Sequence, residues 1–204
     1  MRKQVNLLAV VIAAFLIVSV SANAQNKASI GLKAEANTTS YKYDAESNYS
    51  GSDQGLGGSA GLFFKYDFTR WFALQTDLML HYRNSELKNK YTNEKNKLES
   101  YDLELPVYAI FQSKLGMGKI FVGIGPYIGY GISANMGDID MYSKDETGKA
   151  PLKQLNYGAA AILGYDFGHI QINASYISQN GIGVMKGTSP LRSESISLGV
   201  GFSL

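Results

Sequence analysis

The sequence predicts an all-β protein: an eight-stranded antiparallel up-and-down transmembrane β-barrel, preceded by a cleavable signal peptide. Three observations support this. Eight segments alternate residue by residue between apolar and polar or small side chains, as strands with two different faces do. The connections between these segments are alternately short and long, which is typical of outer-membrane barrels. The chain also opens with the pattern of an export leader.

The last twelve residues show the strand pattern most clearly. Serines and glycines occupy one face, and a strand of about ten residues tilted near 45° is long enough to cross a bilayer. The backbone groups of this strand need a neighbouring strand in the membrane, and a closed barrel supplies one. We therefore expect this to be the membrane-insertion strand. Its apolar face consists of Ile196, Leu198, Val200, Phe202 and Leu204.

Residues 1–24 resemble a secretory signal peptide. Arg2 and Lys3 precede a mostly apolar run at 7–20, and Ala22-Asn23-Ala24 offers a small-residue cleavage site. The apolar run is shorter than the roughly 20 residues that a transmembrane helix needs. We expect cleavage after Ala24, which leaves 25–204 as one barrel domain in the outer membrane of a Gram-negative-type bacterium.

The composition excludes several kinds of partner and site. Without the two basic residues of the leader, 17 of the 19 Lys and Arg remain, and they balance the 17 Asp and Glu. A neutral chain without a basic patch argues against nucleic acid. The chain has no cysteine, so disulfides and thiolate metal sites are excluded, and we predict no cofactor and no metal.

The mature chain divides into eight predicted strands and seven connections. The competing interpretation, a soluble secreted barrel with its apolar face inward, explains neither the charge-free face of nearly every strand nor the alternation of loop lengths. Aromatic side chains gather near the strand ends, as in interfacial girdles. The predicted strands are 28–39, 56–68, 71–83, 101–112, 120–133, 155–167, 169–179 and 193–204. The short turns are 67–70, 113–119 and 166–169, and the long loops are 40–55, 84–100, 134–153 and 180–192.

Two prolines stand inside predicted strands. Pro106 and Pro126 lack the backbone donor that a paired strand uses, and a barrel has no edge strand where this loss is harmless. We therefore expect a bulge or a local break in the strand pairing at each proline.

Several motifs resemble the PorT-like family of eight-stranded outer-membrane barrels. The most distinctive is the Tyr-x-x-Glu-x-Pro core of 101–106, and the others are generic barrel sequences at 31–35, 61–66, 125–129, 164–168 and the terminal strand. The resemblance spans the mature chain and implies the barrel fold and an outer-membrane location. Its eponymous member is linked to protein secretion. The chain departs in ending on Leu204 rather than an aromatic, so Phe202 is expected to serve the barrel-assembly machinery.

The inward faces of the strands carry charges of both signs. Eight strands enclose only enough space for side chains, and an isolated buried charge costs several kcal/mol, so these charges should be paired. His81 and Arg83 lie at about the height of Asp102 and Glu104 on the next strand, where we expect ion pairs. A structural plug is favoured over an ion or proton path. The predicted polar network consists of Lys33, Glu35, Lys65, Asp77, His81, Arg83, Asp102 and Glu104.

The sequence favours a non-enzymatic role. No serine follows the pattern of a nucleophile beside His81, and His169 lies in a short turn. We expect a structural or partner-binding protein of the envelope that acts through its long loops or its periplasmic rim, and an accessory role in protein export is one form of this expectation. The alternatives are a narrow pore for small solutes or ions and, less favoured, a lipid-modifying barrel enzyme. Expected partners are outer-membrane lipid and lipopolysaccharide, the barrel-assembly machinery and other envelope proteins.

Overall fold

The computed structural model describes residues 28–42, 49–53, 55–89, 95–137, 139–144, 150, 152–180 and 192–204. The predicted signal peptide lies outside these residues. No helix in the described part of the chain is long and apolar enough to span a membrane.

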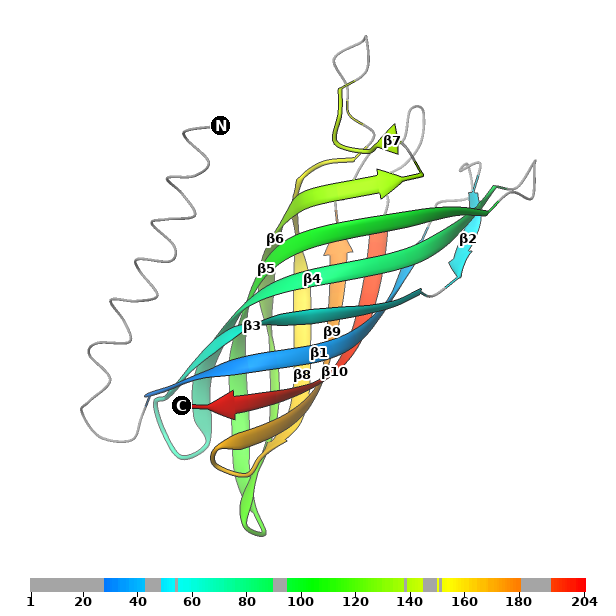
Figure 1. The fold of residues 1–204 in the computed structure, drawn as a ribbon. Coiled ribbons are helices and arrows are strands. Elements are labelled where there is room, and N and C mark those ends of the chain that lie inside the picture. The colour runs from blue at the N-terminus through cyan, green and yellow to red at the C-terminus, as the bar shows by residue number, and fades with distance from the viewer. Residues whose placement is uncertain are drawn as a thin grey trace.

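Eight long strands form a closed antiparallel barrel (Figure 1). Each long strand pairs with the next, and the first pairs with the last from Gly31 opposite Ser203 to Lys42 opposite Arg192, which closes the ring. The predicted barrel is thus confirmed. The long strands are β1 (Ala28–Lys42), β3 (Gly55–Asp67), β4 (Phe72–Asn89), β5 (Lys95–Leu115), β6 (Gly118–Met136), β8 (Leu155–Asp166), β9 (Ile170–Asn180) and β10 (Arg192–Ser203). Two short strands, β2 (Tyr49–Asp53) and β7 (Ile139–Asp140), pair with β4 and β6.

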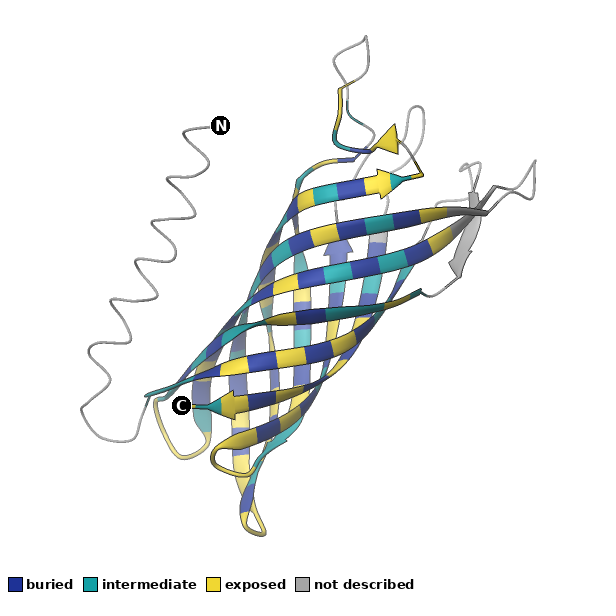
Figure 2. Cartoon of the chain, viewed as in Figure 1, coloured by how far each residue is buried: buried dark blue, intermediate teal, exposed yellow. Residues whose placement is uncertain are grey.

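The wall of the barrel has an apolar exterior and a buried interior. On β10, Leu198 is 66% exposed whereas its neighbour Ser197 is 2% exposed. Figure 2 shows the same alternation of exposed and buried residues along the other strands. The exposed apolar residues, including the five predicted at 196–204, form a surface that suits hydrocarbon rather than water. Side chain direction in the wall therefore follows the period-2 pattern of the sequence.

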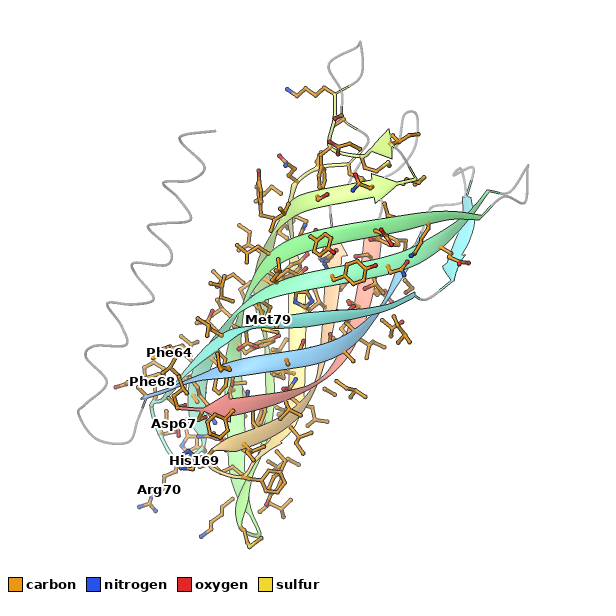
Figure 3. The ribbon with its side chains drawn as sticks, in the orientation of Figure 1. Phe64, Asp67, Phe68, Arg70, Met79 and His169 are labelled. Carbon is orange, nitrogen blue, oxygen red and sulfur yellow. The ribbon has the colours of Figure 1, made fainter. Side chains whose placement is uncertain are left out.

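The short connections lie at one end of the barrel. Gly116 and Gly168 adopt positive φ angles of 59° and 103° in two of these turns, a backbone conformation that glycine adopts most easily. The amide of Leu204 donates to the carbonyl of Ile30 at 2.9 Å, so β1 begins and β10 ends at the same rim. Figure 3 labels Phe68, Arg70 and His169 there. Short turns mark the periplasmic end of an outer-membrane barrel.

Aromatic side chains cluster at both ends of the wall. At the periplasmic end the rings of Trp71 and Phe111 stack with centroids 6.1 Å apart, and those of Tyr165 and Phe167 lie 4.6 Å apart. At the other end Tyr82 and Tyr101 lie 5.2 Å apart. These rings are placed as interfacial girdles require.

The predicted long loop at 84–100 is wrong in extent. Strands β4 and β5 continue to pair as far as Lys88 opposite Lys95, so most of this segment is a β-ribbon that extends beyond the neighbouring strands (Figure 1). The balanced lysines and glutamates of this segment are typical of a solvated loop, and for this reason the sequence predicted one. In the ribbon, Glu86 stands opposite Lys97, and opposite charges across two strands favour pairing.

The strand pairing is interrupted beside both prolines, as expected, but without a change of register. Pairing of β4 with β5 stops after Thr76 opposite Val107 and resumes at Met79 opposite Glu104. The hydroxyl of Thr76 donates to the carbonyl of Pro106 at 3.0 Å and satisfies a backbone group within the gap. The register shift between β5 and β6 lies elsewhere, between Tyr101 and Asp102.

Candidate functional site

The first group of buried charges in the lumen surrounds Lys33. Its ammonium lies 2.7 Å from Asp77 and 2.8 Å from Glu35. Strand β3 separates β1 from β4, so the contact between Lys33 and Asp77 passes over the inner face of β3 and joins two strands that are not neighbours. Asn173 donates to Glu35 at 3.0 Å, and Gln75 donates to Asp77 at 2.9 Å. We call Lys33, Glu35 and Asp77 the Lys33 cluster.

The second group lies on β4 and β5. Arg83 donates to Asp102 at 2.9 Å and to Glu104 at 2.7 Å, and His81 Nε2 lies 3.1 Å from Glu104. The structure thus brings together the four residues for which the sequence predicted ion pairs. Gln179 on β9 donates to Glu104 on β5 at 2.6 Å, and this contact crosses the lumen because β6 and β8 lie between the two strands in the wall. We call His81, Arg83, Asp102 and Glu104 the Arg83 cluster.

Lys65 does not join these two clusters. It lies nearer the periplasmic end, 3.2 Å from Asp166, with its ammonium 5.6 Å from the centroid of the Phe121 ring. Asp67 accepts from Lys119 and from Gln112, each at 3.0 Å. The eight residues predicted as one polar network therefore divide among three groups, and Lys65 lies at a different level from the other two.

The sequence interpretation missed the apolar half of the lumen. This lumen core lies mainly on β5, β6, β8 and β9, and comprises Ala73, Tyr108, Ile110, Phe121, Tyr127, Ala160, Ile162 and Ile177. A side chain at Gly164 would collide with the ring of Phe121, and one at Gly158 with the ring of Tyr127. The inward glycines thus provide the space into which the large rings pack. The sequence did contain a signal for this core, because aromatic residues alternate with outward-facing residues on the same strands whose inward positions are rich in glycine.

A small apolar cluster covers the extracellular end of the lumen. It consists of Tyr41, Leu98, Ala134, Met141 and Leu152, which we call the mouth cap. The amide of Met141 donates to the carbonyl of Ala134, and the amide of Leu152 to that of Met141, both at 2.9 Å. These bonds hold two segments of the third long loop against the strand ends. Side chains fill the barrel at three successive levels. From the periplasmic end these are Lys65 with its partners, then the Lys33 and Arg83 clusters with the lumen core, and then the mouth cap.

The lumen side chains that the structure describes include no serine hydrogen-bonded to His81. Ser59 stands opposite His81 on the adjacent strand, a neighbour that the sequence interpretation did not identify. Its hydroxyl donates toward Glu35 at 3.5 Å, and within the described residues His81 Nδ1 has no hydrogen-bond partner. Nucleophilic catalysis needs the serine within hydrogen-bonding distance of its base. The described residues also contain no group of three or more His, Asp or Glu side chains able to hold a metal ion.

Comparisons with known proteins agree with this architecture. The chain shares 15% identity and a TM-score of 0.51 with the outer membrane protein OprG from Pseudomonas aeruginosa, over 87% of this chain and 96% of that one. It shares 18% identity and a TM-score of 0.50 with Neisserial surface protein A, over 87% and 99%. The outer membrane enzyme PagL, at 13% identity and a TM-score of 0.42 over 82% and 97%, is less similar. At these identities the likeness shows the fold alone.

The sequence of the chain gives the family. A comparison with curated proteins finds no match. Residues 23–178, most of the chain, match the family described as the outer membrane protein beta-barrel domain. With the closed eight-stranded wall, this makes the chain an outer-membrane protein and a member of the outer membrane protein beta-barrel domain family.

Proposed function

We propose that this protein is a non-enzymatic outer-membrane barrel whose closed body anchors extracellular segments for recognition of another component of the envelope. The observation that carries the proposal is the filled lumen. Side chains from β1, β4, β5 and β9 meet across it, and Glu104 and Arg83 are 0% and 2% exposed at their side chains. Eight strands leave little space beyond that which side chains occupy. The barrel then offers binding surfaces at its two ends and on its wall.

The extracellular end offers a surface for recognition. The β4–β5 ribbon extends past the girdle residues Tyr82 and Tyr101, and Met141 and Leu152 of the third loop form part of the mouth cap. Loops and ribbons held on a rigid barrel are suited to binding, because their bases are fixed while their sequences vary freely. A role as an accessory subunit in protein export, which the resemblance to the PorT-like family suggested, is the more specific form of this proposal.

Planar-bilayer recording distinguishes the closed barrel from the alternative of a narrow pore. We expect the wild-type protein to give no current steps. The matched control is a double variant, Phe121→Ala with Tyr127→Ala, which removes two large rings from the lumen core. This variant should give small current steps, which would prove that the barrel inserts into the bilayer. Steps of similar size from the wild type would overturn the closed-barrel proposal.

Particle mass after extraction in mild detergent distinguishes a barrel that acts alone from an accessory subunit of a larger export assembly. A particle that contains only this chain, 22.2 kDa before any processing, supports a self-sufficient anchor or receptor. A much larger particle supports an accessory role, and its other components identify the assembly. Activity on lipid that disappears in His81→Ala would instead favour the enzyme alternative.

A further inference from the structure

A pocket of about 520 Å³ lies where the third long loop meets the extracellular end of the wall. We call it the rim pocket. Its position differs from that of the lumen clusters, because it includes outward-facing residues of β8 as well as loop residues. The lining residues that matter here are Tyr142, Lys144, Lys153, Gln154, Leu155 and Tyr157.

Hydrogen bonds hold the walls of the rim pocket in place. The carbonyl of Gln154 accepts from the amide of Gly131 at 2.7 Å, and its side-chain oxygen accepts from the Tyr130 hydroxyl at 3.2 Å. On the loop side, Asp140 accepts from the amide of Tyr142 at 2.9 Å and from the Ser143 hydroxyl at 3.0 Å. The pocket is therefore formed before any ligand arrives, which reduces the entropy lost on binding.

The two ends of the rim pocket differ in chemistry. Leu155 and Tyr157 are 57% and 63% exposed and point outward in step with Leu163, so the lower end continues into the lipid-facing wall. Lys144 and Lys153 are exposed at the upper end. Among the described residues neither lysine forms an ion pair, whereas Lys119 at the opposite rim is paired with Asp67. An apolar lower end and a cationic upper end match an amphipathic anion.

We propose that the rim pocket binds the phosphorylated sugar headgroup of a glycolipid in the outer leaflet. Lysine is a common point-charge ligand for phosphate, and basic residues at a membrane surface attract anionic lipids. Tyr142 and Gln154 line the same pocket and would meet the sugar hydroxyls, while an acyl chain would lie along Leu155 and Tyr157. This assignment does not depend on the extracellular segments binding a protein.

Native mass spectrometry of the full barrel in detergent, with bisphosphorylated lipid A as the probe, tests the proposal. The wild type should bind this lipid more tightly than the same lipid without its phosphates. Lys144→Gln with Lys153→Gln should weaken binding by roughly ten- to thirtyfold, since each surface lysine contributes about a factor of five. Lys144→Arg with Lys153→Arg should retain most of the binding, because the charges remain.

The control removes two cations from the other rim. Arg70→Gln with Lys114→Gln changes the net charge by the same amount among exposed residues of the short-turn end. Heat-dependent electrophoretic migration checks that each variant forms a closed barrel. Equal weakening by both pairs of substitutions, equal binding of the dephosphorylated lipid to the wild type, or displacement of lipid A by inorganic phosphate would each overturn the proposal. The comparison of lipid A with its dephosphorylated form on the wild type still tests recognition of the phosphates if a variant fails to fold.

Discussion

The two sides of the lumen solve the same packing problem in different ways. On the side of β1 and β4, buried charges are paired, and the Lys33 and Arg83 clusters take partners from strands that are not neighbours. On the side of β6 and β8, aromatic and aliphatic side chains pack over inward glycines. Both the paired charges and the apolar packing fill the lumen. A buried ion pair gains little over apolar packing of equal volume, but removing one partner is strongly destabilising. The charged side therefore tolerates far fewer substitutions than the apolar side.

The largest effect is expected for Arg83→Met. The substitution keeps a side chain of similar length but leaves Asp102 and Glu104 buried without their cation, which should lower the free energy of unfolding by about 3–5 kcal/mol. Urea titration of the barrel in lipid vesicles measures this change in the free energy of unfolding. Adding Asp102→Asn and Glu104→Gln to Arg83→Met should recover most of the loss. A single variant as stable as the wild type would remove the distinction between the two sides.

A smaller effect is expected for Ile162→Val in the lumen core. The substitution removes one buried methylene group in an apolar environment and leaves no polar group unpaired, so it should lower the free energy of unfolding by about 0.5–1.5 kcal/mol. The same urea titration provides the comparison with Arg83→Met. A loss as large as that of Arg83→Met would show that the apolar side is equally intolerant.

No measurable change in stability is expected for Lys97→Ala in the β4–β5 ribbon. Lys97 and Glu99 form an ion pair at 2.7 Å, but both side chains are about half exposed, so water and salt screen the pair. The Lys97 and Tyr82 hydrogen bonds hold the pKa of Glu99 below its ordinary value. In Lys97→Ala this pKa should rise toward that value in an NMR titration. An unchanged pKa would show that Lys97 does not contact Glu99 in solution.

The wall of the barrel could be predicted almost completely from the sequence, because each strand has one face in lipid and period-2 alternation is the direct consequence. The outward residues of β10 are an example: Ile196 and Phe202 both face away from the lumen. Strand ends were less predictable where β4 and β5 continue into water, since polar residues there obey no lipid-facing pattern.

The contents of the lumen were only partly predictable. His81 and Asp102 stand opposite each other in register, so counting along two neighbouring strands brought the Arg83 cluster together. Contacts between distant strands, such as Lys33 with Asp77, depend on side-chain reach across a closed ring, which alternation does not encode. Phe121 and Gly164, by contrast, stand opposite each other on the neighbouring strands β6 and β8, and Lys65 lies close to the short turn at 67–70, so the same counting along strands could have placed both.

The seam between β1 and β10 also constrains when the protein can form. Lys33 stands opposite Gly201 there, so one edge of β1 pairs with β3 but its other edge finds a partner only in β10. Contacts between residues so distant along the chain form slowly. While the last strand is absent, β1 and β9 each present an unpaired edge that can join another chain. A chain interrupted before β10 is therefore left with two open strand edges, whereas a chain that contains β10 has none in its wall.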